Sequence, residues 1–70
     1  MQITINGQAR ECEPATLQEL WRSETEHLDL AGPRGFAIAR NGRVVRQLDW
    51  GSTSVAAGDR IEIIRVMPGG

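Results

Sequence analysis

The stretch RIEIIRV at residues 60–66 decides the fold of this chain of 70 residues. It is the most apolar strand-like segment in the sequence, as is typical of a strand with neighbours on both sides. Side chains alternate between the two faces of a strand, so Ile61 and Ile63 share one face, and Glu62, Ile64 and Val66 share the other. We therefore expect a central strand here, with Ile61 and Ile63 turned toward a helix.

The first 13 residues, MQITINGQARECE, predict a β-hairpin. Apolar residues alternate with polar ones at Met1, Ile3 and Ile5, which is the period of a half-buried strand. Asn6-Gly7 supplies the residue types that a tight hairpin turn needs. The return strand is polar and is expected at an edge of the sheet, with Cys12 turned inward.

One helix is predicted within ATLQELWRSETEHLDL, residues 15–30. Thr16 followed three residues later by Glu19 fits a capping box, with Thr16 as the N-cap. An apolar stripe at helical spacing follows, and Glu24 interrupts it, so the helix is expected to fray soon after Ser23. The members of this stripe are Leu17, Leu20, Trp21, Glu24 and Leu28.

A second hairpin is predicted in FAIARNGRVVRQLDW, residues 36–50. Phe36 and Ile38 alternate with alanines, and Asn41-Gly42 supplies the turn. Beyond the return strand, Leu48 and Trp50 are expected to anchor an irregular turn onto the core. The order strand, strand, helix, strand, strand, strand indicates an α+β fold in which one helix covers one face of a mixed sheet of about five strands.

Composition narrows the classes of function. A domain of this size has one thin core and no room for a deep catalytic cleft. The net charge of −1 favours neither nucleic acid nor membrane as a partner. A single Cys and an N-terminus unlike a signal peptide predict a reducing, cytoplasmic location. No metal, phosphate-loop or catalytic-triad pattern is present, and His27 is expected to be a solvated residue at the helix end.

The sequence closes on Gly69-Gly70, after Met67 and Pro68. On composition alone, a frayed terminus explains such an end as well as a function does. Glycine has no Cβ, so a Gly-Gly end is narrow enough to thread a slot in a partner enzyme and deliver a carboxylate there. Transfer of AMP to that carboxylate would activate it, and a sulfur nucleophile would then leave a thiocarboxylate.

The whole chain resembles the ThiS-type sulfur carrier proteins of thiamine biosynthesis. The resemblance rests on MQITINGQ, TLQEL, ARNGRVV, Trp50, GDRIEII and the closing Gly-Gly pair, in this order and spacing. It implies a ubiquitin-like β-grasp fold over residues 1–66 and a flexible tail at residues 67–70. Arg40 and Pro68 depart from the family pattern.

The resemblance also implies a role for the tail and a set of partners. Gly70 would be adenylated and converted to the thiocarboxylate, and Gly69 would thread beside it. The adenylating partner would be an E1-like, ThiF-type adenylyltransferase that uses ATP and Mg. A ThiG-type thiazole synthase would receive the sulfur, which a donor such as a cysteine desulfurase would supply. The chain would bind no cofactor or metal itself and would act as a protein cosubstrate rather than an enzyme.

The sheet face without a helix is the expected docking surface for these partners. Ala37, Ala39, Ile64 and Val66 would form a small apolar patch there, with arginines at its rim. Half-burial of this face by loops is the alternative. The full set of expected contacts, including the root of the tail, is Ala37, Ala39, Ile64, Arg65, Val66, Met67 and Pro68, and the expected rim is Arg40, Arg60 and Arg65.

Other functions fit the same tail and fold. The small subunit of molybdopterin synthase, or a sulfur carrier for another metabolite, would use the same chemistry with a different client enzyme. A ubiquitin-like modifier would join Gly70 to a lysine amine, and a plain β-grasp interaction module would need no free C-terminus.

Overall fold

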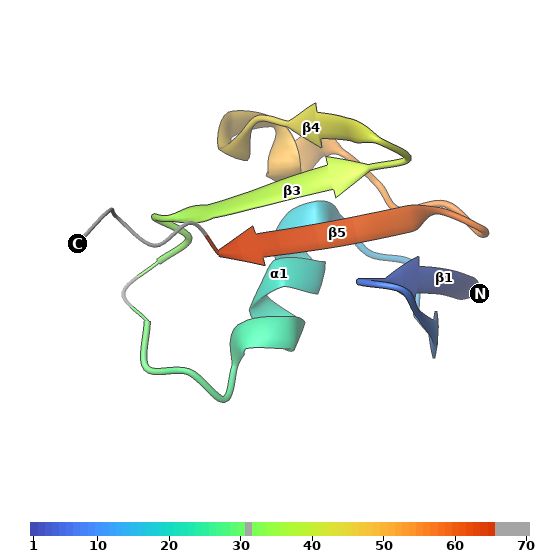
Figure 1. The fold of residues 1–70 in the computed structure, drawn as a ribbon, viewed down its shortest axis with the longest axis horizontal. Helices are drawn as coiled ribbons and strands as arrows, with labels where there is room; N and C mark the ends of the chain where they lie inside the picture. The colour runs from blue at the N-terminus through green and yellow to red at the C-terminus, as the bar shows by residue number, and fades with distance from the viewer. Residues whose placement is uncertain (31, 66–70) are drawn as a thin grey trace.

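The computed structural model describes residues 1–30 and 32–65. Five strands, one α-helix and one 3-10 helix follow each other in the chain (Figure 1). The strands are β1 (Gln2–Ile5), β2 (Gln8–Glu11), β3 (Phe36–Arg40), β4 (Arg43–Val45) and β5 (Arg60–Arg65). The helices are α1 (Leu17–Thr25) and η1 (Gln47–Ser52).

The strands form one mixed sheet in the order β2-β1-β5-β3-β4. β5 lies at its centre, parallel to β1 and antiparallel to β3. The expected position of the final strand is therefore confirmed. The first and last strands lie side by side and α1 is the crossing element between the two hairpins, which is the β-grasp arrangement.

Both hairpins turn at the predicted Asn-Gly pairs. Asn6 and Asn41 have φ values of 49° and 53°, and Gly7 and Gly42 follow with 82° and 84°. Positive φ at both central residues is the geometry of a type I′ turn, whose twist matches that of the flanking strands. β2 is exposed along its whole length, as expected for a polar edge strand.

The helix begins at the predicted cap. The Glu19 N–H donates to the Thr16 hydroxyl, and the Thr16 N–H donates to the Glu19 carboxylate, so both halves of the capping box are present. The last buried position of α1 is Thr25, and Glu24 instead pairs with Arg10 of β2 at 3.0 Å. That ion pair ties α1 to the edge of the sheet.

The core lies between α1 and one face of the sheet. Trp50 is fully buried and donates from its Nε1 to the Val45 carbonyl at 2.9 Å, so it anchors η1 as predicted. The prediction for Leu48 is wrong, because its side chain is 89% exposed. In the 3-10 turn, Trp50 faces the core and Leu48, two residues earlier, faces away. The core residues are Ile3, Ile5, Leu17, Leu20, Trp21, Phe36, Ile38, Trp50, Val55 and Ile61.

Candidate functional site

The candidate site is the face of the sheet opposite α1, together with the end of β5 that leads to the tail. In Figure 1, α1 lies behind β5, so the face toward the viewer is the one that α1 leaves uncovered. We call it the open face. Ile61 pairs with Ile5 on the buried side, so its neighbours Arg60 and Glu62 point to the open face.

Apolar side chains gather on the open face over β3, β4 and β5. Ile64 is opposite Ala37 in the register and is 46% exposed. Ala39 is opposite Val44, which is 72% exposed. Residues directly opposite each other share a face, so these four side chains form one apolar strip across three strands. Ala39 is only 9% exposed, and Glu62 lies opposite it on β5, so Val44 and Ile64 supply most of the accessible apolar surface. The structure therefore brings Ala37, Ala39 and Ile64 together as predicted.

Val44 is the member of the strip that the sequence reasoning missed. The sequence does indicate its position. The Asn41-Gly42 turn fixes the register of the hairpin, and this register places Val44 opposite Ala39. β4 is a short edge strand, and a valine on its outer face is far more exposed than the alanine beside it. Val44 therefore enlarges the apolar surface offered to a partner.

The expected arginine rim is only partly correct. Arg60 lies on the open face beside Thr4. Arg65 is opposite Phe36 and its guanidinium carbon lies 5.6 Å from the centre of the Phe36 ring, so it covers the core side instead. Arg40 likewise turns to the buried side, where its Nε lies 2.8 Å from the Asp59 carboxylate. Both positions follow from strand alternation, because Arg40 and Arg65 share the face of Ile38 and Ile63 on their strands. A role for Arg65 in binding a partner stays a prediction.

A buried carboxylate holds the start of β5 in place. Asp59 accepts hydrogen bonds from Arg40 Nε, Asn41 Nδ2 and the Ala56 N–H, at 2.8 to 3.0 Å. Burial raises the pKa of the Asp59 carboxyl, but these donors and the charge of Arg40 outweigh it and bring that pKa below its ordinary value of 3.8. Asp59 is thus ionised at neutral pH and joins the β3–β4 turn to β5.

The other end of β5 is the end that leads to the tail. The strand ends at Arg65, and its partner Phe36 there is the first residue of β3. The predicted contacts Val66, Met67 and Pro68, and the predicted cargo residues Gly69 and Gly70, lie outside the described residues, as does the predicted boundary between residues 66 and 67. Their roles stay predictions.

Other chemistry finds little support in the described part of the chain. No three His, Cys, Asp or Glu side chains there are placed to hold a metal ion. None of the described helices is long and apolar enough to cross a membrane. Cys12 is partly buried against the core, as expected.

The sequence model of the ThiS family matches residues 3–70, which include all five strands except the first residue of β1 and run through the closing Gly-Gly pair. The chain belongs to the ThiS family. A search among curated proteins found no match.

Two solved structures resemble this ThiS-family chain over its whole length. One is the crystal structure of the thiamine biosynthesis protein ThiS from Geobacter metallireducens, with 27% sequence identity, a TM-score of 0.74 and full coverage of both chains. The other is a solution structure of a thiamine biosynthesis protein from the same organism, with 27% identity and a TM-score of 0.69, covering 100% of this chain and 88% of that one. These likenesses confirm the predicted ubiquitin-like β-grasp fold.

Proposed function

We propose that this chain is a sulfur carrier of thiamine biosynthesis and that the carboxylate of Gly70 is where the sulfur is carried. The observation that carries this proposal is the match of the ThiS family from residue 3 to Gly70, the Gly-Gly end included. The whole-length likeness to a thiamine biosynthesis protein supports the same pathway. In this role the chain is a protein cosubstrate in the cytoplasm, and its partner enzymes supply the catalysis.

The proposed chemistry has two steps at one carboxyl group. The Gly70 carboxylate first attacks the α-phosphorus of ATP, forming an acyl adenylate and releasing pyrophosphate. Hydrosulfide then attacks the carbonyl carbon, and AMP leaves. Where a donor such as a cysteine desulfurase supplies the sulfur as a persulfide, the attack forms an acyl disulfide, and a thiol reductant then cleaves its S–S bond. The product is a C-terminal thiocarboxylate. Activation is needed because AMP leaves readily from the adenylate, whereas an oxide ion does not leave from a free carboxylate.

Each partner enzyme catalyses a different step of this reaction sequence. The ThiF-type adenylyltransferase binds ATP and Mg and carries out the first step. The ThiG-type thiazole synthase takes sulfur from the thiocarboxylate into the thiazole ring. Gly69 and Gly70 have no side chains, so they fit a narrow channel that leads to a buried active centre.

The open face is the surface that we propose both enzymes recognise. Its apolar strip crosses β5, the strand that leads to the tail, so docking there would bring the tail toward a partner's active centre. The strip is small, which suits a carrier that must leave one enzyme before it meets the next. Its residues are Ala37, Ala39, Val44 and Ile64.

Blocking either end of the chain tests the proposal. A short peptide tag after Gly70 removes the free carboxylate, whereas the same tag before Met1 leaves it free. We expect the C-terminally tagged protein to fold normally and to give no thiazole product with ThiF-type and ThiG-type enzymes, ATP and a sulfur source. The N-terminally tagged protein should be active. Full activity of the C-terminally tagged protein, or an isopeptide adduct in place of the sulfur product, would refute the proposal.

A further inference from the structure

The central strand carries two exposed charges of opposite sign on the open face. Arg60 and Glu62 are two residues apart on β5, so their side chains lie on the same side of the sheet, about 7 Å apart along the strand. Both side chains are exposed. Neither takes part in an ion pair within residues 1–30 and 32–65. Both charges are therefore available to a partner that covers this face.

Glu62 lies at the border of the apolar strip. It is opposite Ala39, which is in turn opposite Val44, and Ile64 is the next residue of β5 on the same face. A partner that covers the strip therefore also covers the Glu62 carboxylate. Taking a carboxylate out of water is costly unless a positive charge is placed against it. A partner that fits this face should therefore carry a cationic side chain opposite Glu62.

A hollow lies beside the two charges, between the Asn-Gly turns of the two hairpins. Its volume is about 510 Å³, which is within the range of sites that take up a ligand group. Both turns hold the backbone of β5, because Asn41 Oδ1 accepts from the Arg60 N–H at 2.8 Å and Asn6 Oδ1 accepts from the Ile63 N–H at 2.9 Å. The spacing of Arg60 and Glu62 is thus fixed from both sides. The lining of the hollow includes Thr4, Asn6, Gly7, Gly42, Arg60 and Glu62.

The charges give the open face a direction along β5 (Figure 1). Toward the tail, the side chains on this face are Arg60, Glu62 and Ile64, in the order positive, negative, apolar. A partner surface with the order negative, positive, apolar pairs both charges in one orientation only. A half-turn of the chain would bring like charges together or place charges against apolar side chains, and both arrangements are unfavourable.

Orientation matters because the tail is short. Arg65, the last residue of β5, is three residues beyond Glu62, so a half-turn of the chain about Glu62 would move Arg65 by about 20 Å. Five residues follow Arg65 up to Gly70, and a chain of five residues spans at most about 18 Å. A chain docked in the reversed orientation therefore could not bring Gly70 to the same active centre.

We propose that Arg60 and Glu62 set the orientation in which the ThiF-type adenylyltransferase binds the open face. The enzyme places an arginine or lysine side chain over Glu62 and a carboxylate over Arg60, and the apolar strip supplies contact area. The adenylyltransferase is the partner concerned, because Gly70 must reach its bound ATP before any sulfur is transferred. Arg60 and Glu62 are positioning residues, since they direct Gly70 without touching the reacting atoms. This inference rests on the function proposed above.

Exchange of the two charges tests the proposal. The double variant Arg60→Glu, Glu62→Arg keeps the composition and the net charge of −1, and it changes only the order of the charges. We expect its affinity for the ThiF-type enzyme, measured by calorimetry, to fall about tenfold or more. In assays of pyrophosphate release, the KM for the chain should rise while kcat changes little, because the group that reacts at Gly70 is intact.

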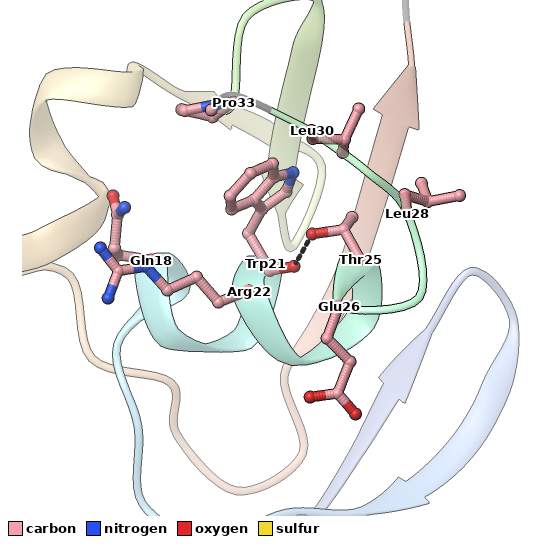
Figure 2. Close-up of a pocket in the computed structure, with 9 residues that line it drawn as sticks. Gln18, Trp21, Arg22, Thr25, Glu26, Leu28, Leu30 and Pro33 are labelled. Carbon is pink, nitrogen blue, oxygen red and sulfur yellow. Dashed lines mark hydrogen bonds between the residues drawn. The ribbon is translucent and has the colours of Figure 1, made fainter.

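A matched exchange on the helix side is the control. Arg22 and Glu26 are also exposed and opposite in charge, and Figure 2 shows both on α1, which covers the other face of the sheet. The double variant Arg22→Glu, Glu26→Arg should bind the enzyme like the parent chain. Urea unfolding should show that both double variants remain folded. Should the exchange on β5 prevent folding, Glu62→Gln takes its place, and its affinity should be about threefold or more below that of the parent.

The outcomes separate this inference from the proposed function. Equal affinity of the folded β5 variant and the parent chain, or an equal loss in the helix-side variant, would overturn the inference. The proposed function would then still stand if the parent chain gave the thiocarboxylate at Gly70. If the parent chain gave no thiocarboxylate with active enzymes, the proposed function would fail, and the inference would fail with it.

Discussion

The side-chain amide of Asn6 pairs with the backbone of Ile63 as a neighbouring strand would. The Ile63 N–H donates to Asn6 Oδ1 at 2.9 Å, and Asn6 Nδ2 donates to the Ile63 carbonyl at 3.4 Å. β1 ends at Ile5, opposite Ile61, so the backbone of Ile63 would otherwise have no partner from β1. The turn residue thus extends the pairing of β5 by one step toward the tail.

We expect Asn6→Gly to loosen β5 locally. Glycine tolerates the positive φ at this position, so the variant removes the side-chain hydrogen bonds without straining the turn. The loss should be about 1 kcal/mol. Amide hydrogen exchange should show faster exchange at Ile63 than in the parent chain. Gly7→Ala is the control, because it strains the turn and leaves the amide of Asn6 in place. If the Ile63 amide exchanged equally fast in Asn6→Gly and the parent, this role of Asn6 would be disproved.

Asp59→Asn should lower the free energy of unfolding by about 1–3 kcal/mol at neutral pH. An asparagine has one acceptor oxygen where Asp59 has two, and its NH₂ group would face a donor, Arg40 or Asn41. Urea unfolding of the two proteins measures the difference. Asp49→Asn is the matched control: Asp49 pairs with Arg46 at the exposed surface, where such pairs contribute at most about 1 kcal/mol. Equal losses in the two variants would contradict the account.

The carboxyl group of Asp59 should also make the free energy of unfolding depend on pH. The pKa of Asp59 is lower in the folded chain than its ordinary value of 3.8, so on acidification the unfolded chain takes up this proton first. The contribution of Asp59 is therefore complete above about pH 5 and is lost as the pH falls through its folded pKa. Urea unfolding at a series of pH values should show a smaller acid loss in Asp59→Asn. An identical acid profile in the parent and the variant would show that Asp59 is not responsible.

Val44→Arg should weaken partner binding without weakening the fold. Val44 is already 72% exposed, so the substitution buries no charge in the free chain, but it places one in the apolar strip. We expect affinity for the ThiF-type enzyme to fall about tenfold or more, as measured by calorimetry. Leu48→Arg is the control, since Leu48 is also highly exposed, at 89%, but lies in η1. Equal loss of affinity in the two variants would contradict the proposal that the partner enzymes bind the open face.

The fold was predictable from this sequence because its local signals agree with one another. The two Asn-Gly turns, the capping box at Thr16 and the apolar run of β5 each fix an element, and the family resemblance then selects the topology. The burial of Leu48 was predicted wrongly, because a short 3-10 helix has too few residues to show a periodic pattern that would indicate its buried face. Side-chain bonds such as those of Asn6 to Ile63, which lies 57 residues away, depend on the tertiary fold and carry no local signal.

The candidate site was predictable only in part. Alternation along β3 and β5 placed Ala37, Ala39 and Ile64 on one face, and the hairpin register would have added Val44. The positions of the arginine side chains were harder to predict, because a long side chain can reach a partner on another segment of the chain. Arg40 pairs with Asp59, and Arg65 packs over the ring of Phe36. Trp21 Nε1 is buried without a hydrogen-bond acceptor among the described residues, and this can be recognised only from the packed core.

The mass of the intact chain tests the central proposal most directly. The purified protein is incubated with its ThiF-type enzyme, ATP and a sulfur source. The masses of the intact chain and of its C-terminal fragment, which locates the change, are then measured by mass spectrometry. The account predicts the exchange of one oxygen for one sulfur at Gly70, and none when ATP is omitted. A chain that keeps its carboxylate under these conditions, with an enzyme shown to be active, would contradict it.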